Sequence, residues 1–297
     1  MLAESSLEIV EREPIIRGTF PKEVVTCRRP DGNILRVFSK YEGNDTHAEF
    51  GHRGDVEYEA LVYRRLLARM RTSTPGFIGS RLDGAAGGTW LALEYAEQVE
   101  RVGRVADGIP VAAQWLGSFH AEAERLLGSE PDLPLKRYDA GYYLGWSRRT
   151  IEFAGSLSGQ FPWLLPLCER FGEAAGLLVT AQATVVHGEF YPKNVFINGD
   201  RIYAFDWESA AVAAGEIDLA MLTTGWPDDV VRRSIEAYAA ARWQGGATPA
   251  SGRLLDAARI YSVLRWLGDR PEWTAAAVDL IPDLEQPARR LALIDGS

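Results

Sequence analysis

The residues best equipped for chemistry gather within residues 185–208. Two apolar runs typical of strands, Val195–Ile197 and Ile202–Phe205, flank Asn198-Gly199, a dipeptide that favours a tight hairpin turn. Polar side chains stand at both open ends of the expected hairpin: His187, Glu189, Lys193 and Asn194 come before it, and Asp206 and Glu208 come after it. The stretch therefore predicts a hairpin with chemically capable groups at its open end.

Oxygen ligands are expected to converge at this open end, because neighbouring antiparallel strands lie about 5 Å apart. Asn194 and Asp206 should be neighbours although twelve positions separate them. A second carboxylate, Glu189, stands five residues before Asn194. Carboxylate and amide oxygens are the ligands that Mg²⁺ prefers, so the sequence predicts a magnesium site.

The elements that must position this site begin upstream with two strands and a helix. Glu23–Arg28 and Ile34–Tyr41 are predicted strands around a Pro-Asp-Gly-Asn turn, and Lys40 lies near the end of the second. Asp55 stands where an N-cap belongs, before a helix with apolar residues at helical spacing, and Glu59 shares the inward face of this helix. A buried carboxylate needs a cationic partner, and Lys40 is the available candidate.

The composition changes after the apolar strand Trp90–Tyr95, and we place a lobe boundary near Ala96–Gln98. From about residue 108 the chain is mostly helical, with helices expected over Pro110–Leu127, Glu169–Ala181, Asp228–Trp243 and Ser251–Leu267. His120 lies on the apolar face of the first of these helices. It is therefore expected to be a core histidine and not a ligand.

The order of these elements and motifs resembles the aminoglycoside phosphotransferase family, the small-molecule branch of the protein-kinase-like fold. The family motif H-G-D-x-x-x-x-N, followed by a hairpin and D-x-D or D-x-E, is similar to residues 187–194 and 206–208 here. The resemblance extends over residues 15–270. It implies an α+β fold of two lobes: a small, mostly β nucleotide-binding lobe with one helix (residues 1–97), and a larger, mostly helical catalytic and substrate-binding lobe (98–297).

The resemblance implies ATP as the phosphate donor and assigns the residues that would bind it. Lys40 would bind the α- and β-phosphates while Glu59 fixes the position of Lys40. Backbone groups of Glu94 and Ala96, in the segment joining the lobes, would hydrogen-bond adenine. A single glycine, Gly18, stands in a turn that either faces the phosphates or is an ordinary turn.

The resemblance also implies Mg²⁺ and a catalytic loop. Asn194 and Asp206 would hold Mg²⁺, with Glu208 as an additional ligand. Glu189 would orient the acceptor hydroxyl, His187 would brace the loop, and Lys193 stands in the same catalytic group.

One loop residue departs from the family pattern, because Glu189 stands where the family usually has Asp. A glutamate is one methylene longer, and a misplacement of about 1 Å can cost on the order of 100-fold in rate. Either the surroundings accommodate the longer acid, or the chain is a non-catalytic, nucleotide-binding pseudokinase that acts as a binding module. The retention of Lys40, Glu59, Asn194 and Asp206 favours an active enzyme. The glycine-poor segment around Gly18 is a second, smaller departure.

The expected reaction moves the γ-phosphate to a hydroxyl of a small polar molecule, such as an aminoglycoside or other antibiotic, an amino sugar or an amino alcohol. The acceptor is expected between Glu189 and the C-terminal helices. Acids in this half could bind a cationic acceptor or simply be solvated: Asp228, Asp229, Asp269 and Glu272. Three aromatic residues could line the site or fill the core: Trp207, Trp226 and Trp266.

Composition argues against several other classes of protein. A formal net charge of −9 disfavours a nucleic-acid partner, which needs a basic face. The two cysteines, Cys27 and Cys168, lack the spacing of a zinc deaminase and are typical of a reducing cytoplasm. A glycosidase carboxylate pair would leave Lys40 and Glu59 unexplained. No signal peptide or membrane segment is visible in the sequence. A cytoplasmic location and a monomer or dimer are expected.

Overall fold

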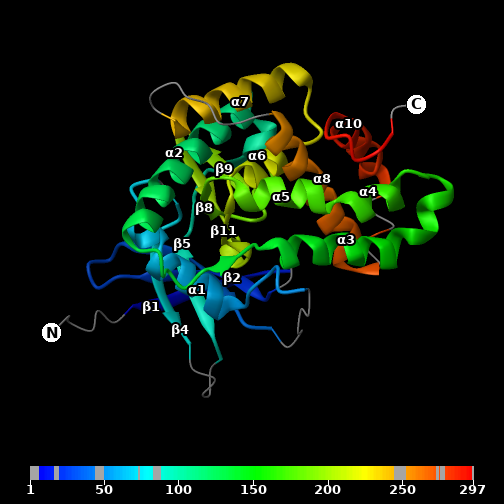
Figure 1. Ribbon diagram of the computed structural model, residues 1–297. Coiled ribbons are helices and arrows are strands. Elements are labelled where there is room, and N and C mark those ends of the chain that lie inside the picture. The colour runs from blue at the N-terminus through cyan, green and yellow to red at the C-terminus, as the bar shows by residue number, and fades with distance from the viewer. Residues whose placement is uncertain are drawn as a thin grey trace. The chain divides into compact units, whose positions relative to one another are not determined.

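The computed structural model describes residues 7–16, 20–43, 50–72, 74–82, 88–243, 252–271, 274 and 278–295 (Figure 1). Contacts divide the chain into two compact units. The first unit is Met1–Glu100 with Phe196–Ser209, and the second unit is Arg101–Val195 with Ala210–Ser297. This partition follows contacts alone, and the lobes 1–97 and 98–297 stay a prediction about domain organisation.

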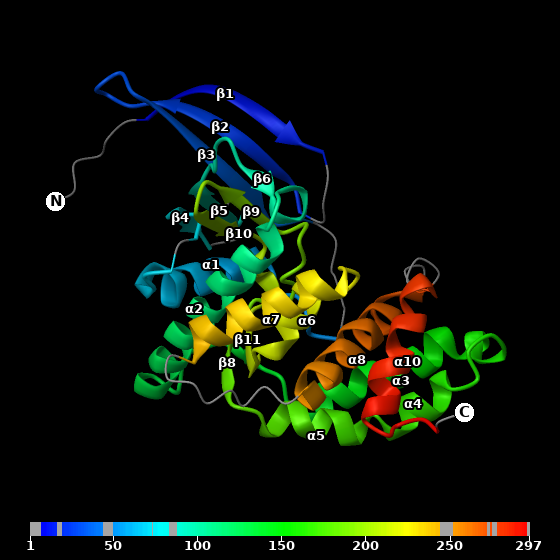
Figure 2. The same ribbon diagram turned by 90° about the horizontal axis from the view of Figure 1, so that it is seen from above.

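The first unit is built on an antiparallel sheet of five strands in the order β1-β2-β3-β5-β4 (Figure 2). The strands are β1 (Glu8–Ile15), β2 (Lys22–Arg28), β3 (Ile34–Tyr41), β4 (Phe77–Arg81) and β5 (Trp90–Glu94). Val25 and Cys27, two positions apart on β2, point to the same side of the sheet and join Val37 and Ala92 in an apolar cluster. The strands predicted before residue 42 are confirmed.

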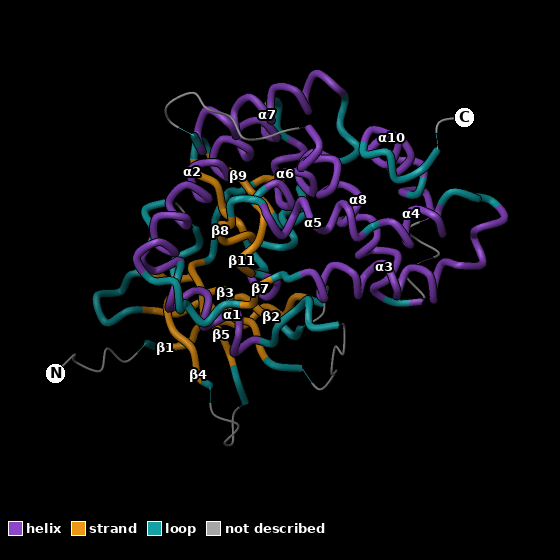
Figure 3. The backbone as a smooth tube through the Cα atoms, in the orientation of Figure 1, coloured by secondary structure: helices purple, strands orange, loops and turns teal. Residues whose placement is uncertain are grey.

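Helix α1 (Val56–Arg65) contacts β5 and β4 of this sheet (Figure 3). Its N-cap is Asp55, whose carboxylate accepts a hydrogen bond from the Tyr58 backbone N–H at 2.7 Å. The buried face of α1 is apolar except for Glu59. Both predictions for this helix, the Asp55 cap and the inward Glu59, are confirmed. A short 3₁₀ helix, η1 (Leu67–Arg69), follows it.

The predicted hairpin is confirmed as β9 (Val195–Asn198) and β10 (Arg201–Ala204), which join β6 (Glu100–Arg101) in a sheet of order β10-β9-β6. The turn lies one residue later than predicted. Asn198 ends β9, and Gly199 takes the left-handed conformation (φ 60°) that a glycine adopts without strain. The 3₁₀ helix η4 (Trp207–Ser209) closes this segment of the first unit.

The second unit is mostly helical (Figures 1 and 3). Its α-helices are α2 (Gly108–Ser129), α3 (Ala140–Ala154), α4 (Leu164–Arg170), α5 (Gly172–Thr180), α6 (Glu216–Thr223), α7 (Asp228–Arg242), α8 (Gly252–Asp269) and α10 (Glu285–Arg290). Its 3₁₀ helices are η2 (Val102–Arg104), η3 (Gly155–Gly159), η5 (Val278–Leu280) and η6 (Pro282–Leu284). Helix α2 packs along α7, and α8 packs against α3 and α6 (Figure 2). The largely buried helix α8 is thus the centre of this helical packing.

A small sheet of order β7-β11-β8 lies within the second unit. Its strands are β7 (Lys136–Arg137), β8 (Ala183–Val186) and β11 (Ala211–Ala214). Strand β8 leads directly into the loop that begins at His187. The α+β fold expected from the sequence is confirmed.

Two further expectations concern cysteines and membrane spans. Cys27 and Cys168 are both buried and form no disulfide. Within the part of the chain that the structure describes, no helix combines the length and the apolar character that a membrane crossing requires.

Candidate functional site

A buried lysine surrounded by three carboxylates lies in the first unit. The Lys40 ammonium on β3 is 2% exposed and donates to Glu59 Oε2 at 2.7 Å, as the sequence predicted. It also donates to Asp206 Oδ1 at 3.2 Å and to Glu208 Oε2 at 2.6 Å. A strand, a helix and the segment after β10 therefore each bring a charged group to one point.

Glu59 ties these elements together, because each of its carboxylate oxygens has its own partner. Oε2 accepts from Lys40, while Oε1 accepts from the backbone N–H of Trp207 at 3.1 Å. The indole of Trp207 donates to the Ala204 carbonyl at 2.8 Å and is fully buried. Of the two roles left open for Trp207, the structure thus gives it the core role.

The charges of this cluster do not cancel, since one ammonium meets three carboxyl groups. Burial alone would lower the pKa of Lys40, but Glu59, Asp206 and Glu208 hold that pKa well above its usual value. Burial raises the pKa of Glu208 to about 7, against the opposing effect of Lys40. The Arg53 guanidinium lies 3.8 Å from Glu208 and adds one positive charge at the edge. The cluster is therefore a site where a further cation would be favourable.

The donor set of the cluster fits a hard divalent cation. Glu59, Asp206 and Glu208 each offer a carboxylate oxygen, and these oxygens lie within 4.8 Å of one another. The Asp206 side chain is 36% exposed, so this ligand is open to solvent. Its backbone is left-handed (φ 66°), a conformation uncommon outside glycine that marks a strongly constrained position. Glu59 joins Asp206 and Glu208 here, whereas Asn194 belongs to the second unit and its metal role stays a prediction.

Glu94 and Ala96 belong to the segment that the sequence predicts to bind adenine. The Glu94 backbone N–H, at the end of β5, donates to the Gly76 carbonyl at 2.7 Å, so this group is already used within the protein. The Glu94 carboxylate forms an ion pair with Arg201 at 3.0 Å. Ala96 is buried, and its role stays a prediction. Gly18 lies outside the described residues.

Asp218, near the start of α6, holds the loop that follows β8 in the second unit. The Asp218 carboxylate accepts hydrogen bonds from the backbone N–H groups of His187 at 2.6 Å and Gly188 at 2.9 Å. His187 Nδ1 in turn accepts from the Glu189 N–H at 3.3 Å. His187 is fully buried, a position suited to the bracing role predicted for it. The sequence predicts a helix that begins at Gly215 with Asp218 near its N-terminus, but that prediction gave Asp218 no role in the site.

The far end of the same loop folds back on Glu189. Asn194 Nδ2 donates to the Glu189 carbonyl at 3.0 Å, and the Tyr191 N–H donates to the same carbonyl at 2.7 Å. Lys193 is exposed, and its ammonium lies 5.3 Å from the ring centres of Tyr191 and Trp266. The structure therefore brings His187, Glu189, Lys193 and Asn194 into one compact loop.

The Glu189 carboxylate meets an arginine that the sequence reasoning missed. Glu189 is 7% exposed, and its Oε1 lies 3.2 Å from Nη1 of the fully buried Arg265 on α8. Asp269, one helical turn later, lies 3.6 Å from the same nitrogen. The signal was an arginine within the otherwise apolar run Ile-Tyr-Ser-Val-Leu-Arg-Trp-Leu of α8.

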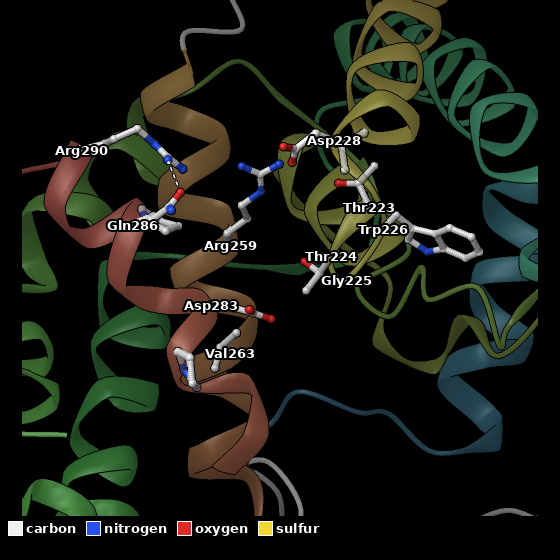
Figure 4. Close-up of a pocket in the computed structure, with 13 residues that line it drawn as sticks. Thr223, Thr224, Gly225, Trp226, Asp228, Arg259, Val263, Asp283, Gln286 and Arg290 are labelled. Carbon is white, nitrogen blue, oxygen red and sulfur yellow. Dashed lines mark hydrogen bonds between the residues drawn. The ribbon is translucent and has the colours of Figure 1, made fainter. Parts of the chain in front are cut away.

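A cavity of about 460 Å³ lies in the second unit (Figure 4). It is lined by residues of the α6–α7 connection, α7, α8, η6 and α10: Thr223, Thr224, Gly225, Trp226, Asp228, Val231, Arg259, Val263, Pro282, Asp283, Gln286, Pro287 and Arg290. Arg259 and Asp228 extend toward one another across it, while Asp283 and Gln286 stand on the wall formed by η6 and α10. The lining thus combines apolar residues with charges of both signs.

The acids and tryptophans proposed for acceptor binding divide by position. Asp228 and Trp226 line the cavity, and Trp266 donates to the Tyr191 hydroxyl at 2.7 Å. Asp229 lies 3.7 Å from Arg233 on the same helix, and Asp269 is buried beside Arg265. Glu272 lies outside the described residues.

The cavity and the loop are linked through Gly103 of η2. A Cβ atom on Gly103 would lie 3.2 Å from the Trp226 ring and 3.5 Å from Pro192, so these two residues flank the same glycine. Trp226 lines the cavity, and Pro192 lies in the loop of Glu189. The Trp226 ring, which points away from the cavity in Figure 4, therefore lies between the cavity and the loop.

Sequence comparison identifies one family. The model of the phosphotransferase enzyme family matches residues 46–255, which is more than half of the chain. A comparison with curated proteins finds no match.

Solved structures with the same fold cover nearly the whole chain. An aminoglycoside 2'-phosphotransferase-IIIa variant in complex with GDP has 10% identity and a TM-score of 0.69, covering 95% of this chain and 93% of that chain. Choline kinase LicA from Streptococcus pneumoniae has 15% identity and a TM-score of 0.65, covering 97% and 95%. Macrolide 2'-phosphotransferase MphH from Brachybacterium faecium has 17% identity and a TM-score of 0.59, covering 99% and 96%. At these identities the similarity establishes the two-lobed, kinase-like fold.

Proposed function

The chain belongs to the phosphotransferase enzyme family, and from this premise we propose that it moves the γ-phosphoryl group of ATP, with Mg²⁺, to a hydroxyl of a small polar molecule. The observation that supports this most is the Lys40 cluster. A buried lysine fixed by Glu59, beside two further carboxylates, suits a site that binds phosphates and a divalent cation together.

The residues proposed to bind the nucleotide lie in the first unit. Lys40 binds phosphate oxygens with its ammonium, which Glu59 holds in place. Asp206 and Glu208 would hold Mg²⁺, and the ion would supply positive charge to the phosphate oxygens. The ion would also compensate the excess negative charge of the three carboxyl groups, which Lys40 alone does not balance.

The residues proposed to act on the acceptor lie in the second unit. The Glu189 carboxylate accepts the proton of the acceptor hydroxyl. The hydroxyl oxygen forms its bond to the γ-phosphorus while the bond from that phosphorus to the bridging oxygen of ADP breaks. Asp218 and His187 keep the backbone of Glu189 in place, through the hydrogen bonds at 2.6 and 3.3 Å.

The cavity beside the loop is the proposed site for the body of the acceptor. Its volume of about 460 Å³ is within the usual range for small-molecule sites. Asp228 offers a carboxylate to a cationic acceptor, and Trp226 lies between the cavity and the Glu189 loop. The similar structures are described as acting on aminoglycosides, choline and macrolides, and these compounds define the first acceptors to test. The buried, unpaired Cys27 and Cys168 fit the proposed cytoplasmic location.

The test is ADP release from Mg·ATP in the presence of aminoglycosides, a macrolide, spectinomycin and choline. We expect one class to stimulate turnover. Glu189→Gln should lower kcat at least about 100-fold while Mg·ATP still binds, and Asp206→Asn should weaken Mg·ATP binding itself. The rival function, a pseudokinase that only binds nucleotide, predicts an ATP-dependent thermal shift with no stimulation by any acceptor.

A further inference from the structure

Arg265 is a buried cation that the proposed reaction does not yet use. Its side chain is fully buried on α8, where removal of a charge from water is costly unless the charge is compensated. Burial on its own would lower the pKa of Arg265, but Tyr191, Glu189 and Asp269 among its neighbours hold that pKa well above its usual value. Arg265 is therefore a permanent cation inside the second unit.

The guanidinium contacts the loop of Glu189 at two points. Nη1 lies 3.2 Å from the Glu189 carboxylate, and Nη2 donates to the Tyr191 hydroxyl at 2.8 Å. The next residue, Trp266, also donates to that hydroxyl, at 2.7 Å, and its ring centre lies 4.9 Å from the Arg265 guanidinium carbon. Two successive residues of a packed helix thus fix both ends of the segment 189–191.

The position of the guanidinium is set independently of Glu189. Asp269 lies 3.6 Å from Nη1 and is itself buried, so a second anion holds the cation from the helix side. Arg265 therefore has little freedom to follow its partner if the acid at position 189 changes length.

The side chain of Glu189 is long enough to bring its carboxylate into contact with this fixed guanidinium. An aspartate at position 189 would carry its carboxylate about one C–C bond, or roughly 1.5 Å, farther back along the side chain. From a separation of 3.2 Å, a retreat of this size would break the contact with Nη1. The glutamate reaches the arginine where the shorter acid would not.

We propose that Arg265 is a positioning residue that holds the Glu189 carboxylate in its working place, and that this contact is why the longer acid serves at position 189. The inference rests on the proposed phosphoryl transfer, with Glu189 as the group that meets the acceptor hydroxyl. It turns the departure from the family pattern into a matched pair, a glutamate on the loop and an arginine on α8.

The proposed pair of Glu189 and Arg265 predicts that aspartate, the usual acid of the family, supports less activity at position 189 than glutamate does. Glu189→Asp, which restores the usual family acid, should lower kcat by about 100-fold because the carboxylate loses its support. Arg265→Gln should lower kcat by a similar factor and leave the KM for ATP unchanged. Arg265→Lys keeps the charge without the planar fork and should recover part of the loss. The double variant E189D/R265Q should lose little more than either single variant, because both changes remove the same contact.

The experiment measures kcat, the KM for ATP and the KM for the stimulating acceptor, chosen from choline, spectinomycin, an aminoglycoside and a macrolide. Thermal unfolding and Mg·ATP binding are measured on the same samples. Arg253→Gln, an exposed arginine on the same helix, is the matched control and should behave as wild type. Glu189→Asp tests the pair while Arg265 stays in place. The proposal can therefore still be tested if Arg265→Gln fails to fold.

Full kcat in Glu189→Asp would overturn the inference alone, and so would full kcat in a folded Arg265→Gln or Arg265→Lys protein. Strictly additive losses in E189D/R265Q would also overturn it, since the two residues would then act separately. A wild type that releases no ADP with any acceptor would overturn the proposed phosphoryl transfer, and the inference with it.

Discussion

At the scale of residues, Lys40 governs the charge balance of the first unit. Three carboxyl groups lie within 3.2 Å of its ammonium, and the ammonium is almost completely buried. Removal of one partner from a buried ion pair leaves the remaining charge uncompensated, which costs about 3–5 kcal/mol. The contribution of Lys40 to stability should therefore be far larger than that of a surface lysine.

Lys40→Met is expected to lower the free energy of unfolding by about 3 kcal/mol, because Glu59, Asp206 and Glu208 would repel one another without the ammonium. Urea unfolding at pH 8 measures this loss. Lys22→Met is the matched control, since Lys22 pairs with Lys40 in the β2–β3 register but is only half-buried. An equal loss in the two variants would show that the cluster does not depend on its lysine.

Sequence reasoning reached the charged residues whose partners are set by local periodicity, and it missed those set by tertiary packing. Glu59 was assigned to the inward face of its helix by 3.6-residue spacing, and Lys40 followed as its partner. Asp218 and Arg265 sit within apolar helical runs, where spacing says only that they are buried. What a buried charge meets depends on which helix packs beside it, and the pattern of one helix does not contain that information.

At the scale of elements, one helix in each unit begins with an aspartate N-cap. The Asp55 carboxylate caps α1 and the Asp139 carboxylate caps α3, each by accepting a backbone hydrogen bond, at 2.7 and 2.8 Å respectively. Only α1 carries a residue of the lysine cluster, Glu59. The two caps therefore form a natural pair for separating stability from function.

Asp55→Ala and Asp139→Ala should each lower the free energy of unfolding by about 1 kcal/mol, the usual cost of losing a side-chain N-cap. Only Asp55→Ala should also weaken Mg·ATP binding, because fraying of α1 loosens Glu59 and with it Lys40. Isothermal titration with Mg·ATP, beside urea unfolding, distinguishes the two effects. Equal nucleotide affinity in the two variants would contradict the link between α1 and the phosphate site.

The boundaries of elements were harder to predict than their existence. The expected helix Glu169–Ala181 is two helices, α4 and α5, which divide at Phe171. The Phe171 N–H donates to the Cys168 carbonyl, three residues back, so the chain turns more tightly there than an α-helix. Continuous apolar spacing hides such a change of direction, because both helices bury residues against α3.

At the scale of the whole molecule, a buried histidine couples stability to pH. His120 is fully buried on α2, beside the Tyr238 hydroxyl at 2.9 Å and Asp218 at 3.3 Å, which confirms the core role predicted for it. Burial lowers the pKa of His120 from 6.5 to about 4, although Asp218 opposes this shift. Between these values the unfolded chain binds a proton that the folded chain does not.

The folded state should therefore lose up to about 3 kcal/mol as the pH falls from 6.5 to 4, and this contribution is fully present above pH 6.5. Urea unfolding at pH 7 and at pH 5 measures the slope. His120→Gln should be less stable at pH 7, but its stability should fall less between the two pH values. The same slope in both proteins would assign the acid sensitivity to other groups.

The return of the chain to the first unit sets the order in which this protein can be completed during translation. The segment Phe196–Ser209 is made about a hundred residues after Glu100, and synthesis at ~5–20 residues per second puts roughly 5–20 s between them. During that interval a nascent chain holds Lys40 and Glu59 but has neither Asp206 nor Glu208. The first unit is therefore completed only after Arg101–Val195, the first segment of the second unit, has been synthesised.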